Sequence, residues 1–430
     1  MKTINIGIIG AGNVGLGVAN ILHQRPGLIA KIAGASIKVK YICDIDKSKR
    51  RLLGSKKYIF TSQARRVIND PEVDIIVELI GGIHPAKEFI IEAMRNGKHI
   101  VTANKALLAE CGLEIFETAQ DCGVDIYFEA SVLAGVPIIK VLREAYSGDK
   151  INAVLGIVNG TCNFILTKMS EEGVDFGQAL KEAQLKGYAE AKPQLDINGW
   201  DSAHKLALLA LLCFGKFVEL KHIYVEGISS ISANDIAYAR DFGYVIKLLA
   251  IAKLSEAALE VRVAPTLLPN EHLLAGVRGV YNAALVVSDL AGGILFNGKG
   301  AGSLPAASAA ISDIVDLARN IKAGAVRRVP EYCRSGSSIK LRRISEIASR
   351  YYIRFSVIDR PGVLAKISGI LGRHNISIAS VAQKERKERH IVPVVIMTHE
   401  AKESSLRLAL SKIDKLSVVK AKSVAIRVER

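Results

Sequence analysis

The chain has 430 residues, of which 50% are apolar and 23% are charged, proportions that are typical of globular proteins and argue against a disordered chain. It has no run of eighteen uncharged apolar residues and no signal-peptide pattern at its start, so we expect a cytoplasmic protein of two or three domains without a membrane-spanning helix. The formal net charge of +16 is spread along the chain, which favours a solvated surface that attracts an anionic cofactor over a nucleic-acid-binding arm.

The six cysteines lie scattered in apolar segments, and no two of them form a C-x-x-C pair. This distribution is typical of buried, reduced thiols. We therefore expect neither a disulfide framework nor a zinc site.

The first 130 residues alternate strand and helix patterns. A strand over Ile4–Ile9 is followed by a helix over Val14–Arg25, and a second strand covers Ile37–Cys43. The next predicted elements are the strand Val73–Ile80, the helix Pro85–Asn96, the strand Lys98–Thr102, the helix Cys111–Cys122 and the strand Asp125–Phe128. Such alternation predicts an α/β domain with a parallel, doubly wound sheet over residues 1–130.

The pattern changes after Glu129, and residues 131–325 read as a mixed α+β domain for substrate binding and dimerisation. Its predicted elements are the strand Ile151–Asn159, helices over Gly160–Met169, Phe176–Lys186 and Ser202–Leu212, the strand Ile223–Ile228, the helix Ala237–Lys253 and the strand Leu259–Leu268. Residues 326–350 carry arginine, proline, glycine and serine and are interpreted as a linker.

The last segment, 351–430, is long enough for a small domain of its own. Its predicted elements are the strand Arg354–Ile358, the helix Val363–His374, the strands Ile378–Gln383 and Ile391–Thr398, the helix Ser404–Lys415 and the strand Val418–Val428. This is the βαββαβ order of the ferredoxin-like fold.

A G-x-G-x-x-G motif, Gly10-Ala11-Gly12-Asn13-Val14-Gly15, directly follows the first strand and begins the first helix. In this position Gly10 makes the tight turn, Gly12 lets a pyrophosphate approach the backbone, and Gly15 lets helix and strand pack closely. The free N–H groups of the helix N-terminus then face the anion. We expect a Rossmann dinucleotide-binding domain, with Asn13 and Val14 at the phosphates.

Two strand ends add to this predicted cofactor site. Asp44 ends the second strand, where a carboxylate binds the ribose 2′-OH of NAD, whereas a basic residue would hold the 2′-phosphate of NADP. The nearby basic residues leave the choice between NAD and NADP open: Lys47, Lys49, Arg50, Lys56 and Lys57. Gly81 follows the strand over Val73–Ile80 and is expected to line the same site.

Two lysines are candidates for catalysis. Lys105 follows a parallel strand, at whose carboxyl end ligands bind in open α/β sheets, although it could also be a surface lysine. Lys205 follows Asp201 by four residues on a predicted helix, so the two share a face. An exposed ion pair would explain them too. Together with Glu190 and Asp196, however, they suit an amino-acid substrate whose ammonium needs carboxylates and whose carbonyl oxygen gains a proton on reduction.

The stretch from Ala183 to Lys205 resembles the signature of the homoserine dehydrogenases. The matching residues are Ala183, Gly187, Tyr188, Ala189, Pro193, Asp196, Ile197, Gly199, Asp201 and Lys205. Lys192 departs from the family, which usually has Asp, Asn or Ser there. The resemblance implies reversible, NAD(P)-dependent interconversion of L-aspartate 4-semialdehyde and L-homoserine, in threonine, methionine and isoleucine biosynthesis.

The same resemblance assigns roles to residues of the signature. It implies that Lys205 donates the proton, that Lys105 assists at the reacting centre, and that Glu190 binds the substrate ammonium. Asp196 and Asp201 would orient the substrate and Lys205. The resemblance also implies that Tyr188 contacts the substrate and Gly187 the cofactor.

Four further segments extend the resemblance over residues 1 to about 325. Thr102–Lys105 resembles the T-A-N-K segment beside the nicotinamide, which implies cofactor contacts from Thr102 and Lys105. Val158–Asn163 resembles the V-N-G-T-x-N motif, which implies a substrate contact from Thr161. Gly298–Gly302 resembles a late glycine-rich loop in which Gly300 lies near the cofactor. The segment Phe128–Pro137 resembles one that holds a sodium or potassium ion, with these implied ligands: Glu129, Val132, Ala134 and Val136.

The last eighty residues resemble an ACT domain, a small regulatory module, at Asp359–Leu364 and His374–Ile376. Gly362 lies where such domains bring an amino-acid ligand against the backbone. The resemblance implies an effector, with threonine favoured, and a homodimer or homotetramer. A domain that serves only for oligomerisation, or an RNA-binding fold, would be the alternative.

Two other functions remain open. One is an oxidoreductase of the same layout that acts on a different amino-acid aldehyde or keto acid. The other is a non-catalytic protein that senses NAD or binds nucleic acid through its basic surface. The set Glu190, Asp196, Asp201 and Lys205 argues against the first, and binding to phosphocellulose that survives physiological salt would favour the second. We expect no aspartate-kinase segment, because the dinucleotide motif begins at Gly10.

Overall fold

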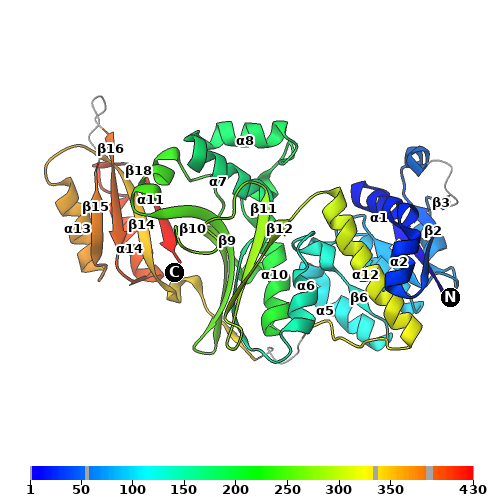
Figure 1. Ribbon diagram of the computed structural model, residues 1–430. Coiled ribbons are helices and arrows are strands. Elements are labelled where there is room, and N and C mark those ends of the chain that lie inside the picture. Colours follow the sequence, from blue (N-terminus) through cyan, green and yellow to red (C-terminus); the bar gives the residue numbers. More distant parts are fainter. Residues whose placement is uncertain (1, 54–57, 333–337, 384–390, 430) are drawn as a thin grey trace. The chain divides into compact units, whose positions relative to one another are not determined.

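The computed structural model describes residues 2–53, 58–332, 338–383 and 391–429 (Figure 1). Its contacts divide the chain into two compact units. The first comprises residues 1–154, 204–223 and 282–338, and the second comprises residues 155–203, 224–281 and 339–430. The described residues do not include Lys56, Lys57, Cys333 or the basic cluster 384–389.

The first unit contains a six-stranded sheet in the order β3-β2-β1-β4-β5-β6, with every neighbouring pair parallel. This is the strand order of the Rossmann fold, as the alternating pattern predicted. The strands are β1 (Thr3–Ile9), β2 (Ser36–Cys43), β3 (Ile59–Thr61), β4 (Ile75–Glu78), β5 (His99–Thr102) and β6 (Ile126–Tyr127). The helices between them are α1 (Asn13–Gln24), α2 (Pro26–Ala33), α3 (Ala64–Ile68), α4 (Ala86–Arg95) and α5 (Lys105–Asp121).

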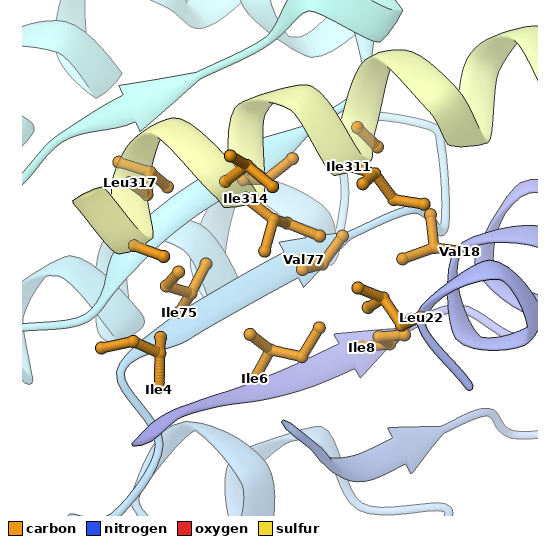
Figure 2. Close-up of a cluster of buried hydrophobic side chains, with 14 of the residues drawn as sticks. Ile4, Ile6, Ile8, Val18, Leu22, Ile75, Val77, Ile311, Ile314 and Leu317 are labelled. Atoms are coloured by element: carbon orange, nitrogen blue, oxygen red, sulfur yellow. The ribbon is translucent and has the colours of Figure 1, made fainter. Parts of the chain in front are cut away.

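The core of this sheet is completed by a helix from much later in the chain, α12 (Ser303–Ala323). Side chains that alternate along β1 and β4 point to one face, where they meet α1 and α12 (Figure 2). Ile311, Ile314 and Leu317 recur at helical spacing on α12 and belong to this buried cluster. The predicted boundaries of the domains at 130 and 325 stay a prediction, but α12 packs with the Rossmann core.

Other elements of the first unit are α6 (Ile138–Lys140), most of α10 (Trp200–Phe214) and β12 (Gly293–Lys299). The division between the units runs within β7 (Ile151–Ile157), α10 and β11 (Tyr281–Ser288).

The second unit begins with α7 (Gly160–Glu172), α8 (Phe176–Leu185) and α9 (Gln194–Ile197). After β8 (Tyr224–Val225) and α11 (Ala233–Asp241), it forms a long hairpin of β9 (Tyr244–Ser255) and β10 (Ala258–Pro269). The two hairpin strands pair antiparallel over all twelve residues of each, from Tyr244 opposite Pro269 to Ser255 opposite Ala258. The short β13 (Lys340–Leu341) also pairs with β10.

The predicted helix over Ala237–Lys253 is wrong. α11 ends at Asp241, and Gly243, with a φ of 81°, turns the chain into β9. The run after Gly243 is almost continuously apolar because β9 is buried on both faces, and such a run shows no period that separates a strand from a helix. The predicted strand over Ile223–Ile228 is likewise only the two residues of β8.

The C-terminal segment has the predicted βαββαβ order. Its elements are β14 (Ala348–Ile358), α13 (Val363–Arg373), β15 (Ile378–Ala382), β16 (Ile391–Thr398), α14 (Glu403–Ile413) and β18 (Val419–Val428), with a short β17 (Ala401–Lys402) beside β14. The strands lie in the order β18-β14-β16-β15, and both helices contribute to one buried cluster with the sheet. β18 also pairs with β10, so β15 is the outer strand at the other end of this order.

A buried charge cluster joins this module to the rest of the second unit. Asp235, at the start of α11, is fully buried. Its carboxylate accepts hydrogen bonds from the Tyr352 hydroxyl (2.9 Å) and from Nε (2.7 Å) and Nη2 (3.1 Å) of Arg354, both on β14. Because a buried charge is stable only when it is paired, these bonds fix β14 against α11.

Within the described residues, every helix is too short or too polar to cross a membrane. The five described cysteines are free thiols. Cys43 and Cys162 are buried as expected, whereas Cys111, Cys122 and Cys213 are only partly buried.

Candidate active site

The predicted dinucleotide motif forms a tight turn between β1 and α1. Gly10 has a φ of 108°, and a Cβ there would come within 2.6 Å of the Leu79 backbone. A Cβ on Gly15 would lie 2.0 Å from the Gly10 carbonyl oxygen, so neither position accepts a side chain. Gly12 faces open space and caps α1 without a side-chain hydrogen bond. The turn therefore exposes the N–H groups at the start of α1.

A cavity of 510 Å³ opens beside this turn. Four of the predicted cofactor residues line it: Gly10, Gly12, Asp44 and Gly81. Lys49 lines it as well, and Phe89 of α4 adds an apolar wall. A glycine-lined approach to a helix N-terminus, together with an apolar pocket, suits the phosphates and the adenosine of a nicotinamide dinucleotide. Asn13 and Val14 are the first residues of α1.

Asp44 is held in its ionised form by the groups around it. Its carboxylate accepts hydrogen bonds from Lys49 Nζ (2.8 Å), Asp46 N (2.9 Å) and Ala11 N (2.8 Å). Burial works to raise the pKa of Asp44, but these hydrogen bonds outweigh it and lower the pKa. Asp44 thus links the end of β2 to the glycine turn, and Lys49 offsets its charge at the cavity wall.

A buried carboxylate that the sequence reasoning missed lies at the end of β4. Glu78 is fully buried and accepts hydrogen bonds from the Thr102 hydroxyl (2.6 Å) and from the backbone of Ile80 (2.8 Å) and Gly81 (3.3 Å). Burial raises its pKa. Glu78 therefore joins Thr102 to the loop that carries Gly81. An acid inside the apolar run Val73–Ile80 was the signal that could have revealed it.

Lys105 is the first residue of α5 and lies at the carboxyl end of β5. Asn104 caps the helix by accepting a hydrogen bond from Leu107 N (3.2 Å), and its amide donates to Gly82 O (2.6 Å). The T-A-N-K segment is thus tied to the glycine loop after β4. Lys105 is thus the first residue of a helix whose N-terminus is held by the hydrogen bonds of Asn104.

The carboxylates of the signature are held by an asparagine from the V-N-G-T-x-N motif. Asn159 Nδ2 donates to Asp196 Oδ1 and to Asp201 Oδ2, each at 2.8 Å. Its Oδ1 accepts from Cys162 N (2.8 Å) and so caps α7. The motif Val158–Asn163 does not by itself predict a role for Asn159, because the sequence does not show which groups its amide meets.

Two other predicted substrate residues, Thr161 and Tyr188, are joined by a hydrogen bond. The Thr161 hydroxyl donates to Tyr188 O (2.6 Å), and the Tyr188 ring packs edge-on against Phe164 with 5.1 Å between ring centroids. Gly187 turns the chain after α8 with a φ of 72°. Glu190 is exposed, so the structure leaves its carboxylate accessible.

Asp201 and Lys205 both lie on α10, one turn apart, and each is only 8% exposed. Charged side chains are seldom buried to this degree without a reason. An exposed surface ion pair, the simpler interpretation of their spacing, is therefore wrong.

The segment implied to hold a cation is buried, and its carboxylate accepts two backbone hydrogen bonds. The Glu129 carboxylate accepts from the backbone N–H groups of Ile139 (2.8 Å) and Lys140 (2.7 Å), although burial raises its pKa. The other implied ligands are also buried: Val132, Ala134 and Val136. Ala134 has a φ of 43°, a left-handed backbone that non-glycine residues seldom adopt. Among the described residues no cluster of three or more His, Cys, Asp or Glu side chains could hold a metal ion.

Gly300 follows β12 and leads to α12. A Cβ there would come within 2.0 Å of the Asn282 side chain. This glycine is therefore required for close packing in the loop, and the structure does not place it in the cavity beside Gly10.

The Rossmann sheet and its glycine turn define a nicotinamide-dependent oxidoreductase. Residues 137–315 match the homoserine dehydrogenase family, residues 10–129 match the homoserine dehydrogenase NAD-binding domain, and residues 351–418 match the ACT domain. A homoserine dehydrogenase from Neisseria gonorrhoeae is 41% identical over 432 residues, which cover 100% of this chain and 99% of that protein. The chain therefore belongs to the homoserine dehydrogenase family, which confirms the resemblance seen in its signature.

Two solved structures of homoserine dehydrogenases are also similar to this chain. The crystal structure of a homoserine dehydrogenase from Thiobacillus denitrificans has a TM-score of 0.94 and 42% identity, and covers 100% of this chain and 99% of that chain. A hyperthermophilic archaeal homoserine dehydrogenase in complex with NADPH has a TM-score of 0.63 and 27% identity, and covers 74% of this chain and 98% of that chain.

Proposed function

We propose that this chain interconverts L-aspartate 4-semialdehyde and L-homoserine by hydride transfer with NAD or NADP, and that the predicted site residues carry out the reaction. The observation that carries the proposal is the cluster in which the Asn159 amide holds Asp196 and Asp201 at 2.8 Å. Two fixed carboxylates beside the signature lysine suit a site that orients a charged amino-acid substrate and the lysine that protonates it.

The nicotinamide supplies or accepts the hydride, and the protein supplies position and charge. Gly10, Gly12 and Gly81 hold the dinucleotide at the turn after β1. Glu190 binds the ammonium, and Asp196 and Asp201 orient the substrate and Lys205. Tyr188 and Thr161 contact the substrate. The resemblance implies that Thr102, Lys105, Gly187 and Gly300 would contact the cofactor when it is bound.

Lys205 acts as the general acid in aldehyde reduction. Its ammonium donates a proton to the carbonyl oxygen as the hydride reaches the carbon, and it takes the proton back during homoserine oxidation. Asp201, one turn earlier on α10, holds the Lys205 side chain in place. Lys105 stabilises the negative charge that develops on the oxygen.

The test is Lys205→Ala, compared with Lys192→Ala. Lys192 is exposed in the same signature and is not assigned to the chemistry. Lys205→Ala should lower kcat for homoserine oxidation by roughly 10²–10⁴-fold, the usual contribution of general acid–base catalysis, and should leave cofactor binding unchanged. Lys192→Ala should keep wild-type kcat. A near wild-type kcat for Lys205→Ala would refute the assignment.

A monovalent cation is proposed at Glu129, Val132, Ala134 and Val136. The left-handed backbone at Ala134 supports it, because such strained residues persist where a function requires them. Backbone carbonyls and a carboxylate are hard oxygen ligands, which suit sodium or potassium. A crystal grown in rubidium should show anomalous density at these carbonyls, and a map without it would remove the proposal.

The cofactor choice is proposed to be relaxed, with NAD used appreciably. Asp44 repels a 2′-phosphate, whereas Lys49 beside it attracts one, so neither charge dominates the cavity wall. Cys43 supports this choice, because NADP-preferring relatives commonly carry arginine there.

The ACT domain is proposed to bind threonine. Gly362 has a φ of 84° as the N-cap of α13, is exposed, and has open space where a Cβ would lie. A ligand carboxylate can therefore approach the backbone N–H groups at the start of α13. The outer strand β15 offers an edge for pairing with a second copy, which supports a homodimer or homotetramer.

The effector proposal is tested in the intact chain. Millimolar threonine should inhibit homoserine oxidation, and Gly362→Asp should raise the half-inhibitory concentration at least about tenfold, because a second carboxylate repels that of the ligand. Ser411→Asp, an exposed substitution on α14, is the matched control and should not change the inhibition. Inhibition that is equal in all three proteins would leave the ACT domain as an assembly device.

Cytoplasmic location and the domain boundaries at 130, 325 and 350 complete the proposal. Fractionation of the producing cell checks the location, and limited proteolysis with mass spectrometry of the fragments checks the boundaries.

A further inference from the structure

A second cavity, of 330 Å³, lies within the second unit. Its lining residues come from α7, α11 and β9, which pack against one another, and from the segment between β10 and β11. Figure 1 labels these elements. This volume is at the lower end of the range of about 300–1,000 Å³ that is usual for cavities that bind small ligands.

The charged residues of this cavity are mostly cationic. Arg240 comes from the last turn of α11, Lys247 from β9, and Arg278 from the segment before β11. Glu171 is the one carboxylate of the lining and lies 3.3 Å from Arg278. Three cations and one anion give a formal charge of +2.

Lys247 sets this cavity apart from a solvated basic surface, because its side chain is buried and only 2% of the residue is exposed. Among the described residues, its Nζ donates to Asn163 Oδ1 (3.0 Å) and Val277 O (2.5 Å). An ammonium has three N–H donors, so one is left for the cavity that Lys247 lines. No carboxylate of the residues that the structure describes accepts a hydrogen bond from Lys247, and a buried ammonium without a carboxylate partner costs free energy.

We propose that this cavity is a binding site for the phosphate group of a small molecule. Lys247 provides the buried donor at its base, and Arg240 and Arg278 provide planar guanidinium groups at its exposed side, a geometry that suits phosphate oxygens. An amino-acid zwitterion fits less well, because its ammonium would face three cations and a single carboxylate.

The cavity is connected to the proposed substrate site through α7. Asn163, which binds Lys247, lies one turn after Asn159, which holds Asp196 and Asp201. Asn163 also donates to Val277 O (3.3 Å), so the helix, Lys247 and the cavity wall form one hydrogen-bonded group. A phosphate at Lys247 would therefore act directly on the first turn of α7.

The probe is sulfate, which resembles phosphate in size and does not titrate near neutral pH. Binding is measured by calorimetry on the intact protein at constant ionic strength, with the nicotinamide cofactor saturating so that its own phosphate site is filled. Arg240→Gln and Arg278→Gln should each raise the dissociation constant about tenfold, because each removes a charge-assisted hydrogen bond. Arg95→Gln, an exposed arginine on α4 outside the cavity lining, should not change it.

A second readout isolates Lys247. Burial lowers the pKa of Lys247 to about 8, and the charge of Arg278 contributes. A bound anion favours the charged lysine, so sulfate binding at pH 8 should take up protons, seen as a heat that changes with the ionisation enthalpy of the buffer. Lys247→Met should remove both the uptake and the binding, while its thermal unfolding shows that it is folded.

The outcomes separate the alternatives. Saturable binding that fails in the cavity variants supports the site, and tighter binding of glycerol phosphate than of sulfate assigns an ester ligand rather than the free ion. An equal loss in Arg95→Gln would mean an adventitious ion only. No saturable sulfate binding, or binding without proton uptake at pH 8, would overturn the proposal.

Discussion

Replacing Asn159 tests whether the Asn159–Asp196–Asp201 cluster forms the substrate site. Asn159→Asp keeps an oxygen that can cap α7, because asparagine and aspartate cap helices equally well. It removes both hydrogen bonds of 2.8 Å to Asp196 and Asp201 and places a third negative charge beside them. Hydrogen bonds to charged groups contribute roughly 1.5–3 kcal/mol each, so the loss is roughly 3–6 kcal/mol before the repulsion is counted.

If this loss falls on the substrate complex, kcat/KM for homoserine should fall by at least about 10²-fold, since roughly 1.4 kcal/mol corresponds to tenfold. Asn159→Ser is the matched variant, because serine caps the helix and adds no charge; its loss should be smaller. The dissociation constant of the cofactor, measured by fluorescence titration, should stay unchanged in both. A kcat/KM within fivefold of wild type for the aspartate variant, in a protein that unfolds at the normal temperature, would refute the reasoning.

Three further predictions concern charge. The pKa of Lys247 is about 8 in the folded protein and 10.5 when the side chain is exposed. The free energy of unfolding of the wild type should therefore rise, relative to that of Lys247→Met, by up to about 3 kcal/mol between pH 8 and 10.5. A difference in melting temperature between the two proteins that does not change with pH would contradict this. Lys49→Met should shift the ratio of kcat/KM for NADP to kcat/KM for NAD about tenfold toward NAD. In the wild type, a preference for NADP above about a thousandfold in kcat/KM would show that the cofactor choice is not relaxed. Asp235→Ala should lower the free energy of unfolding in urea by about 3–5 kcal/mol, because it removes the carboxylate that pairs with the partly buried Arg354 and the buried Tyr352 hydroxyl. A loss below about 1 kcal/mol would mean that the cluster does not fasten the ACT domain.

Features that depend on neighbouring residues could be predicted from the sequence. The glycine turn is one of them, because Gly10 has a left-handed φ and a Cβ on Gly15 would meet the Gly10 carbonyl oxygen five residues earlier in the chain. The βαββαβ order of the last eighty residues is another, because strand and helix periods are local. The signature from Ala183 to Lys205 identified the family for the same reason: its residue types and spacing are written in one continuous segment.

What the tertiary structure alone decided involves partners far apart in the chain. The apolar run after Gly243 is a strand because β10 pairs with all of it, and the run itself has no period. α12 joins the Rossmann core some three hundred residues after β1, since its apolar stripe fits the face that β1 and β4 leave open. The roles of Glu78 and Asn159 also depend on partners in other segments of the chain. A buried polar group must find its partners, and the sequence shows the group but not which backbone or carboxylate the fold brings within hydrogen-bond distance.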